Sequence, residues 1–96
     1  MSKQPAVYIL FNRRNGTLYI GVTSNIVQRI WQHKRGLVDG FSKKYNLHKL
    51  VYVEVFESMD SAIQYEKRLK KWNRKWKIEL IEERNPEWKD LYRELI

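Results

Sequence analysis

Two neighbouring stretches, AVYILF (residues 6–11) and TLYIGV (residues 17–22), decide the fold of this chain. In both stretches the residues alternate with a period of two, which is typical of β-strands. The segment between them ends in Asn15-Gly16, and both of these residues accept the positive φ of a tight hairpin turn. A two-residue turn there predicts an antiparallel hairpin with Tyr8 and Tyr19 on one face, offset along the strands. A β-bulge would change that parity.

Helical and strand patterns follow in turn. Thr23-Ser24-Asn25 offers N-caps for a helix that ends at Gly36. Residues 37–48 read as a loop that can include one helical turn. The stretch KLVYVEVF, residues 49–56, is rich in β-branched and aromatic residues and predicts a third strand.

The C-terminal part reads as one long helix and one short helix. The long helix is expected to begin after Ser58 or Asp60 and to continue to about Glu83. Its apolar face recurs in steps of three and four, through Ala62, Tyr65, Leu69, Trp72, Trp76 and Leu80. Asn85-Pro86 should break it, with Pro86 in the first turn of a last helix through Tyr92. The predicted fold is an α/β domain of the α+β type, order ββαβαα, spanning residues 1–96. Helices should cover one face of a small three-stranded antiparallel sheet.

The composition excludes several classes of protein. The chain has 96 residues, 43% of them hydrophobic and 14% aromatic, which suits one small folded domain and not a disordered tail. It has no cysteine, so disulfides and thiolate metal sites are excluded. No signal-peptide pattern is present, and no apolar run approaches the ~20 residues of a membrane span. A cytoplasmic protein with no membrane partner is expected.

The charge is strongly basic and unevenly distributed. The net charge is +8, yet residues 79–96 carry a net −3, so residues 1–78 carry +11. Such an excess favours a polyanionic partner, although a role in solubility alone remains an alternative. The candidate nucleic-acid-binding residues are Lys34, Arg35, Lys43, Lys44, Lys70, Lys71, Arg74 and Lys75.

Three residues have side chains suited to phosphodiester chemistry. Arg29 and His33 lie one helical turn apart and can point at the same place. An arginine can grip phosphate oxygens, and a histidine can move protons near neutral pH. Glu66 is a lone carboxylate ahead of a basic run, and magnesium can be held by a single protein carboxylate with several waters. The simpler alternatives are an exposed polar pair on a helix and a Glu66–Lys70 ion pair at i,i+4.

The order of these residues resembles the GIY-YIG nuclease family, over Ala6 to about Asp90. The first motif reads Ala6-Val7-Tyr8 instead of Gly-Ile-Tyr, and the second is Tyr19-Ile20-Gly21. The resemblance implies that Tyr8 orients the attacking water and that Tyr19 is the general base. It likewise implies that Arg29 binds phosphate, that His33 occupies the family's histidine or tyrosine position, and that Glu66 holds the metal. Gly21 would leave room beside the sheet, and Asn73 would lie on the same helix flank as Glu66.

The resemblance therefore implies an endonuclease that depends on Mg²⁺ (or Mn²⁺) and hydrolyses phosphodiester bonds. DNA is the expected partner and RNA a second candidate, with recognition by structure or with low sequence specificity. A non-catalytic nucleic-acid-binding module on the same fold is the main alternative. A protein-interaction domain that docks a partner through its acidic C-terminal segment is another. Trp72 and Trp76 could stack on unpaired bases, but their spacing fits the core better.

Overall fold

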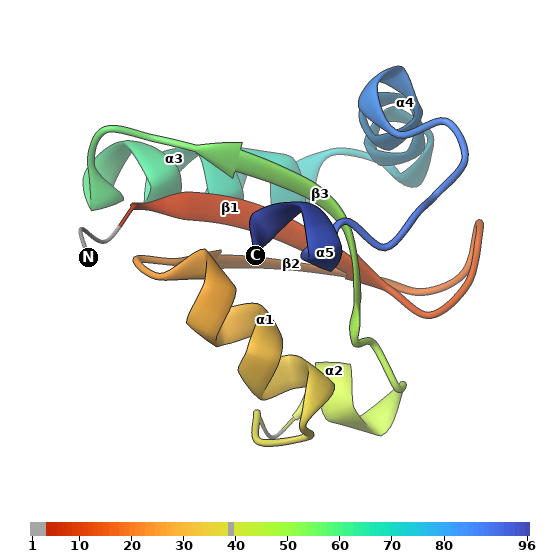
Figure 1. The fold of residues 1–96 in the computed structure, drawn as a ribbon. Helices are drawn as coiled ribbons and strands as arrows, with labels where there is room; N and C mark the ends of the chain where they lie inside the picture. Colours follow the sequence, from red (N-terminus) through yellow and green to blue (C-terminus); the bar gives the residue numbers. More distant parts are fainter. Residues whose placement is uncertain (1–3, 39) are drawn as a thin grey trace.

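The structure is a computed structural model that describes residues 4–38 and 40–96. The first three residues of the predicted 1–96 domain therefore lie outside the described residues. Three strands form one antiparallel sheet in the order β2-β1-β3 (Figure 1). This confirms the α+β class. The predicted order ββαβαα is kept, with one additional short helix before β3 and with the predicted long helix divided into two. The elements are β1 (Ala6–Phe11), β2 (Leu18–Thr23), α1 (Ile26–Lys34), α2 (Phe41–Lys44), β3 (Lys49–Val55), α3 (Met59–Lys71), α4 (Arg74–Arg84) and α5 (Tyr92–Leu95).

The hairpin between β1 and β2 has a longer turn than predicted. Phe11 pairs with Leu18, so the connection runs over residues 12–17 and the predicted two-residue turn is wrong. Asn12 explains the difference, because its Oδ1 accepts hydrogen bonds from the backbone N–H groups of Arg13 (2.7 Å) and Thr17 (3.0 Å). These bonds close a wider loop across its base.

The longer turn keeps the predicted parity. Tyr8 lies opposite Gly21, and Tyr19 lies opposite Leu10. The ring centroids of the two tyrosines are 6.3 Å apart. The prediction that both tyrosines share a face of the sheet is therefore confirmed, because the register moved by an even number of residues.

Helices cover both faces of the sheet, so the prediction that only one face is covered is wrong (Figure 1). Every residue of β1 is buried, which requires a partner on each side of the central strand. One face packs against α3 and α4, through Val7, Ile9, Phe11, Ala62, Leu69 and Ile81. The other packs against α1 and α5, through Tyr8, Leu10, Ile26, Ile30, Tyr92 and Leu95.

The predicted long helix is divided into α3 and α4. Trp72 is extended (φ −64°, ψ 148°), and Asn73 then caps α4 by accepting a hydrogen bond from the Trp76 N–H at 2.9 Å. Such a cap stabilises a helix start by about 1 kcal/mol, enough to favour a new start here. The break turns Trp76 outward to 54% exposure, so its predicted place in the core is wrong. Ile81 on α4 is buried.

The segment after α4 forms a loop, where a helix starting at Pro86 was predicted. The buried Asn85 amide donates to the carbonyls of Val51 (3.2 Å) and Lys89 (2.9 Å). Trp88 has φ of 55°, which a right-handed helix does not allow. The last helix, α5, therefore begins only at Tyr92, and the predicted helix start is wrong.

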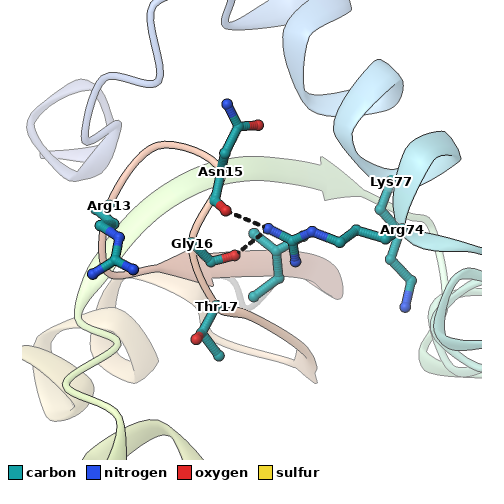
Figure 2. A pocket seen from close by; sticks show the side chains of 7 residues that line it. Arg13, Asn15, Gly16, Thr17, Arg74 and Lys77 are labelled. Carbon is teal, nitrogen blue, oxygen red and sulfur yellow. Dashed lines mark hydrogen bonds between the residues drawn. The ribbon is translucent and has the colours of Figure 1, made fainter.

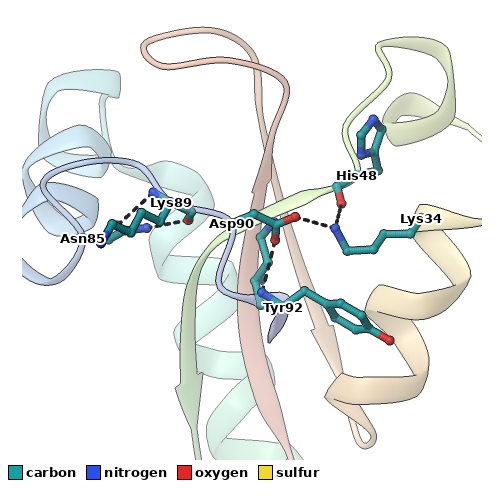
Figure 3. Close-up of polar contacts among 7 residues, drawn as sticks. Lys34, His48, Asn85, Lys89, Asp90 and Tyr92 are labelled. Atoms are coloured by element: carbon teal, nitrogen blue, oxygen red, sulfur yellow. Dashed lines mark hydrogen bonds and ion pairs between the residues drawn. The ribbon is translucent and has the colours of Figure 1, made fainter. Parts of the chain in front are cut away.

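Asp90 fastens this C-terminal segment to the rest of the fold (Figure 3). Its carboxylate accepts a hydrogen bond from the Leu50 N–H at 3.0 Å and forms an ion pair with Lys34. Partial burial opposes ionisation, but the hydrogen bonds from Lys34, Leu50 and Tyr92 outweigh it and hold the pKa of Asp90 below its usual value.

Among the described residues, no helix is long and apolar enough to span a membrane.

Candidate active site

Tyr8 lies at the centre of the candidate site, and the glycine opposite it makes room for its ring. The Tyr8 side chain is 2% exposed and crosses over Gly21 of the edge strand β2. A Cβ atom at Gly21 would lie 2.4 Å from Tyr8 Cζ and 2.5 Å from its hydroxyl oxygen. Any larger residue would displace the ring, so the second motif needs glycine for steric reasons.

A buried chain of hydrogen bonds links Tyr8 to α1 and α2. The Tyr8 hydroxyl lies 3.0 Å from His33 Nε2, and His33 Nδ1 lies 3.1 Å from the Ser42 hydroxyl. His33 and Ser42 are both buried. Since both hydroxyls can donate or accept, either neutral tautomer of the imidazole completes the chain. Ser42 was not predicted, because a lone serine in a loop-like stretch carries no periodic signal.

Burial sets the protonation of this chain. Burial, followed by the positive charge of Arg29, lowers the pKa of His33 to about 4, so the imidazole is neutral at pH 7. Burial, followed by the neighbouring Tyr19, raises the pKa of Tyr8 above its ordinary value. Tyr8 therefore keeps its proton at neutral pH, and the chain can hold or pass a proton without carrying a net charge.

Tyr19 joins the buried chain to an exposed row of aromatic rings. Its ring centroid is 5.8 Å from that of His33 and 6.4 Å from that of Phe41, with which it stacks. Phe41 in turn lies 4.6 Å from Tyr45, and these two rings are 48% and 43% exposed. The sequence FSKKY gave no helical or strand period, so Phe41 and Tyr45 were not predicted as site residues.

Arg29 and Glu66 place opposite charges near the Tyr8 hydroxyl. Burial and Tyr19 have the largest effects on the pKa of Tyr8, and both raise it. Arg29 has a smaller effect that lowers this pKa, and Glu66 has a smaller effect that raises it. The two residues come from α1 and α3, which cover opposite faces of the sheet. Among the residues described, the Arg29 guanidinium pairs with no carboxylate. It is therefore available for an anion.

Glu66 is partly buried and forms an ion pair. Its side chain is 12% exposed, and its Oε2 lies 2.8 Å from Lys70 Nζ. The i,i+4 pair considered as the simpler alternative is thus present. Within residues 4–38 and 40–96, no three His, Cys, Asp or Glu side chains gather as a metal cluster. A lone glutamate fits magnesium, which keeps several waters, better than it fits zinc, which needs three or four protein ligands.

The predicted nucleic-acid-binding residues fall into three groups. Arg35, Lys43 and Lys44 are exposed near α1 and α2, and Lys70, Lys71 and Lys75 are exposed on α3 and α4. Lys34 and Arg74 are bonded within the fold, to Asp90 and to carbonyls of the β1–β2 turn. Asn73, predicted to share the Glu66 flank, is instead the N-cap of α4.

The two tryptophans lie beside acidic residues of α4. Trp72 and Trp76 line a groove together with Glu79, Leu80 and Glu83. The carboxylates of this groove would repel a phosphate backbone, so the groove does not support base stacking on these rings. Other acids of the tail pair within the chain, Glu82 with Arg14 at 3.5 Å and Asp90 with Lys34.

The fold and the arrangement of these side chains define the class. Residues 4–79 match the model of the GIY-YIG catalytic domain, and the chain belongs to that family. The family comprises nucleases, generally metal-dependent, whose substrates are nucleic acids. The match ends before the acidic segment that Asp90 fastens to the sheet.

Relatives of similar length share this similarity along most of their chains. A UPF0213 protein of Staphylococcus haemolyticus is 37% identical over 81% of this chain and 94% of its own. A UPF0213 protein of Syntrophus aciditrophicus is 37% identical over 84% of this chain and 92% of its own. The solution NMR structure of a UPF0213 protein from Bacillus halodurans matches with a TM-score of 0.58 at 25% identity, covering 91% of this chain and 92% of that one.

Proposed function

We propose that this domain is a metal-dependent endonuclease that hydrolyses phosphodiester bonds in DNA, by structure or with low sequence specificity. One observation carries the proposal: the Tyr8 hydroxyl is hydrogen-bonded to a neutral His33 while the charges of Arg29 and Glu66 both act on it. These residues come from three separate elements, and a purely structural cluster would not need a guanidinium that has no carboxylate partner within residues 4–38 and 40–96.

The residues divide the chemistry of hydrolysis between them. Arg29 binds the phosphate oxygens and offsets the charge that grows on them. Tyr19, in its phenolate form, takes the proton from the attacking water and becomes the phenol, and Tyr8, held by His33 and Ser42, orients that water. Glu66 would hold the metal ion, magnesium or manganese. A bound divalent ion supplies charge stabilisation for the phosphate and the leaving oxygen.

The exposed rings beside Tyr19 support a preference for DNA with unpaired bases. Phe41 and Tyr45 offer faces on which bases can stack, and Lys44 lies with its Nζ 5.5 Å from the Tyr45 ring centroid. Stacking accepts every base, which agrees with low sequence specificity.

A non-catalytic nucleic-acid-binding module is the second candidate. The Glu66–Lys70 ion pair favours it, since a glutamate occupied by a lysine has a structural role without any metal. This candidate uses the same basic residues and predicts binding without cleavage.

A cleavage panel separates the two candidates. Plasmid, single-stranded, flapped and branched DNA, together with RNA of matched sequence, are incubated with magnesium, with manganese or with a chelator. Metal-dependent cutting of at least one DNA, strongest where bases are unpaired, supports the endonuclease. Binding to the same DNAs with no cutting under any metal leaves the non-catalytic module.

A further inference from the structure

An open pocket of about 540 Å³ lies where the β1–β2 turn meets the start of α4 (Figure 2). The turn contributes residues 15–18 and the side chain of Arg13. The first two turns of α4 contribute Arg74 and Lys77. None of the candidate active-site residues lines this pocket. The residues that line it come from two segments about 60 residues apart in the chain.

The charges in the pocket are all positive. Arg13, Arg74 and Lys77 line it, and no carboxylate does. The Arg13 guanidinium makes no ion pair with a carboxylate of the described chain. The neighbouring acid, Glu82, is instead occupied by Arg14 and by the indole N–H of Trp88. Three cations without a counter-ion favour an anion as the occupant.

The pocket is held in shape before any ligand arrives. One Nη2 group of Arg74 donates to the carbonyls of Asn15, at 2.6 Å, and of Gly16 (Figure 2). Its Nη1 and Nε have no acceptor among the described residues, so they remain available to a phosphate. A Cβ at Gly16 would lie 2.2 Å from Asn12 Oδ1, so the turn has no room for a larger residue there. A preformed site loses little entropy when it binds.

A short series of contacts also connects the pocket to Glu66. Lys77 Nζ donates to the carbonyl of Lys70 at 3.4 Å, and Lys70 pairs with Glu66 one turn earlier on α3. At 1.5 Å of rise per helical residue, the pocket begins on the order of 10 Å from Glu66. Neighbouring phosphates of one strand lie farther apart than the rise of about 3.4 Å along a duplex axis, so that separation spans fewer than about three nucleotides.

We infer that this pocket is a second phosphate-binding subsite, which holds a backbone phosphodiester within three nucleotides of the scissile phosphate. The inference rests on the proposed function for its register, because Glu66 marks the scissile position. Arg13 and Lys77 supply charge, and Arg74 supplies both charge and a fixed direction for its free N–H groups. The subsite recognises no base, and it fixes the path of the strand along α3.

The test compares two double variants that lose the same charge. Arg13→Gln with Lys77→Gln removes two cations of the pocket, whereas Lys89→Gln with Arg93→Gln removes two exposed cations of the C-terminal segment. Binding to a single-stranded DNA is measured without divalent metal over a range of salt concentrations. The pocket variant should lose about tenfold in affinity, and the slope of log K against log salt should flatten by about one unit. The control variant should keep the parental slope.

A scan of the DNA tests the register. Each phosphate in turn is replaced by an uncharged methylphosphonate. One replacement, within three nucleotides of the cut, should weaken DNA binding by the parent and should not weaken binding by the pocket variant any further. Equal slopes and affinities for the two double variants would overturn the inference. A second result would also overturn it: NMR shows that inorganic phosphate binds saturably at the Gly16 and Thr17 amides, while the pocket variant keeps the parental slope of log K against log salt for DNA. If the parent cuts no DNA but the two double variants differ in slope and one phosphate position alone distinguishes the parent from the pocket variant, the nuclease proposal fails and the subsite stands.

Discussion

The hydroxyl group of Tyr8 lies 3.0 Å from Nε2 of His33, and this buried contact joins the central strand of the sheet to α1. Burial on both sides of the contact keeps the imidazole neutral and the phenol protonated at pH 7. The pair therefore holds one transferable proton next to the edge strand that carries Tyr19.

His33 should titrate far below an ordinary histidine. Its pKa is expected near 4, against an ordinary value of 6.5, because burial and Arg29 disfavour the imidazolium. The unfolded chain takes up this proton near pH 6.5, so stability should fall as the pH falls from about 6.5 towards 4. NMR titration of the imidazole, assigned by comparison with His33→Gln, checks the value. A midpoint near 6.5 would contradict the buried contact.

Gly21→Ala should damage both stability and the site. The new Cβ would lie 2.4 Å from Tyr8 Cζ, so the ring or the edge strand must move. Overpacking of this kind costs about 1–3 kcal/mol in the free energy of unfolding. Urea unfolding measures that loss, and a cleavage assay measures the displacement of the Tyr8 hydroxyl. An alanine variant as stable and as active as the parent would show that Tyr8 is free to move.

Tyr19→Phe should leave the fold intact, because only the hydroxyl is removed and the contacts of the ring remain. If Tyr19 is the general base, cleavage should fall about a hundredfold or more. Tyr92→Phe on α5 is the matched control, since it removes a hydroxyl from a partly buried ring outside the site. Parental cleavage by Tyr19→Phe, together with an inactive His33→Ala, would assign the base to His33.

The sequence was sufficient for features that depend on local periodicity. The three strands follow from alternation, and the predicted shared face of Tyr8 and Tyr19 is confirmed because the longer turn moved the register by an even number of residues. The family motif then located Arg29, His33 and Glu66, which the structure places on α1 and α3 beside the sheet. The motif gives the positions of these three residues, and their roles are tested by the substitutions.

Features that depend on single contacts were not predictable in this way. The break before α4 follows from one Asn73 side chain that outweighs an apolar stripe continuing through Trp76. The burial of Ser42 follows from one hydrogen bond to His33. The covering of both faces of the sheet follows from α1 packing on β1, a tertiary contact that no local pattern encodes. Each of these depends on a free energy of about 1 kcal/mol or on residues distant in sequence.

Asp90→Asn should loosen the C-terminal segment. The carboxylate accepts hydrogen bonds from Leu50 and Tyr92 and pairs with Lys34, so its pKa lies below the ordinary 3.8. Its stabilising contribution is therefore complete above about pH 4 and is lost as the pH falls through the lowered pKa. Urea midpoints should be lower for the variant at pH 7, and the difference should shrink below pH 4. Glu87→Gln, which changes an exposed carboxylate, is the control. Equal midpoints for Asp90→Asn and the parent at pH 7 would contradict this role.

Glu66→Gln tests the metal-dependent nuclease most directly. The change keeps the size of the side chain and removes the charge that would hold a metal. DNA binding should be retained or slightly strengthened, because a negative charge near phosphate is gone. Lys70→Gln is the matched variant, since it breaks the same ion pair and leaves the carboxylate in place.

The decisive measurement is parallel nicking of one DNA substrate, with magnesium, by the parent, Glu66→Gln and Lys70→Gln. The parent should cut, Lys70→Gln should retain cleavage even if it binds more weakly, and Glu66→Gln should cut nothing at any magnesium or manganese concentration. Cleavage by Glu66→Gln at the parental rate would contradict the account, because Glu66 would then be only the ion-pair partner of Lys70.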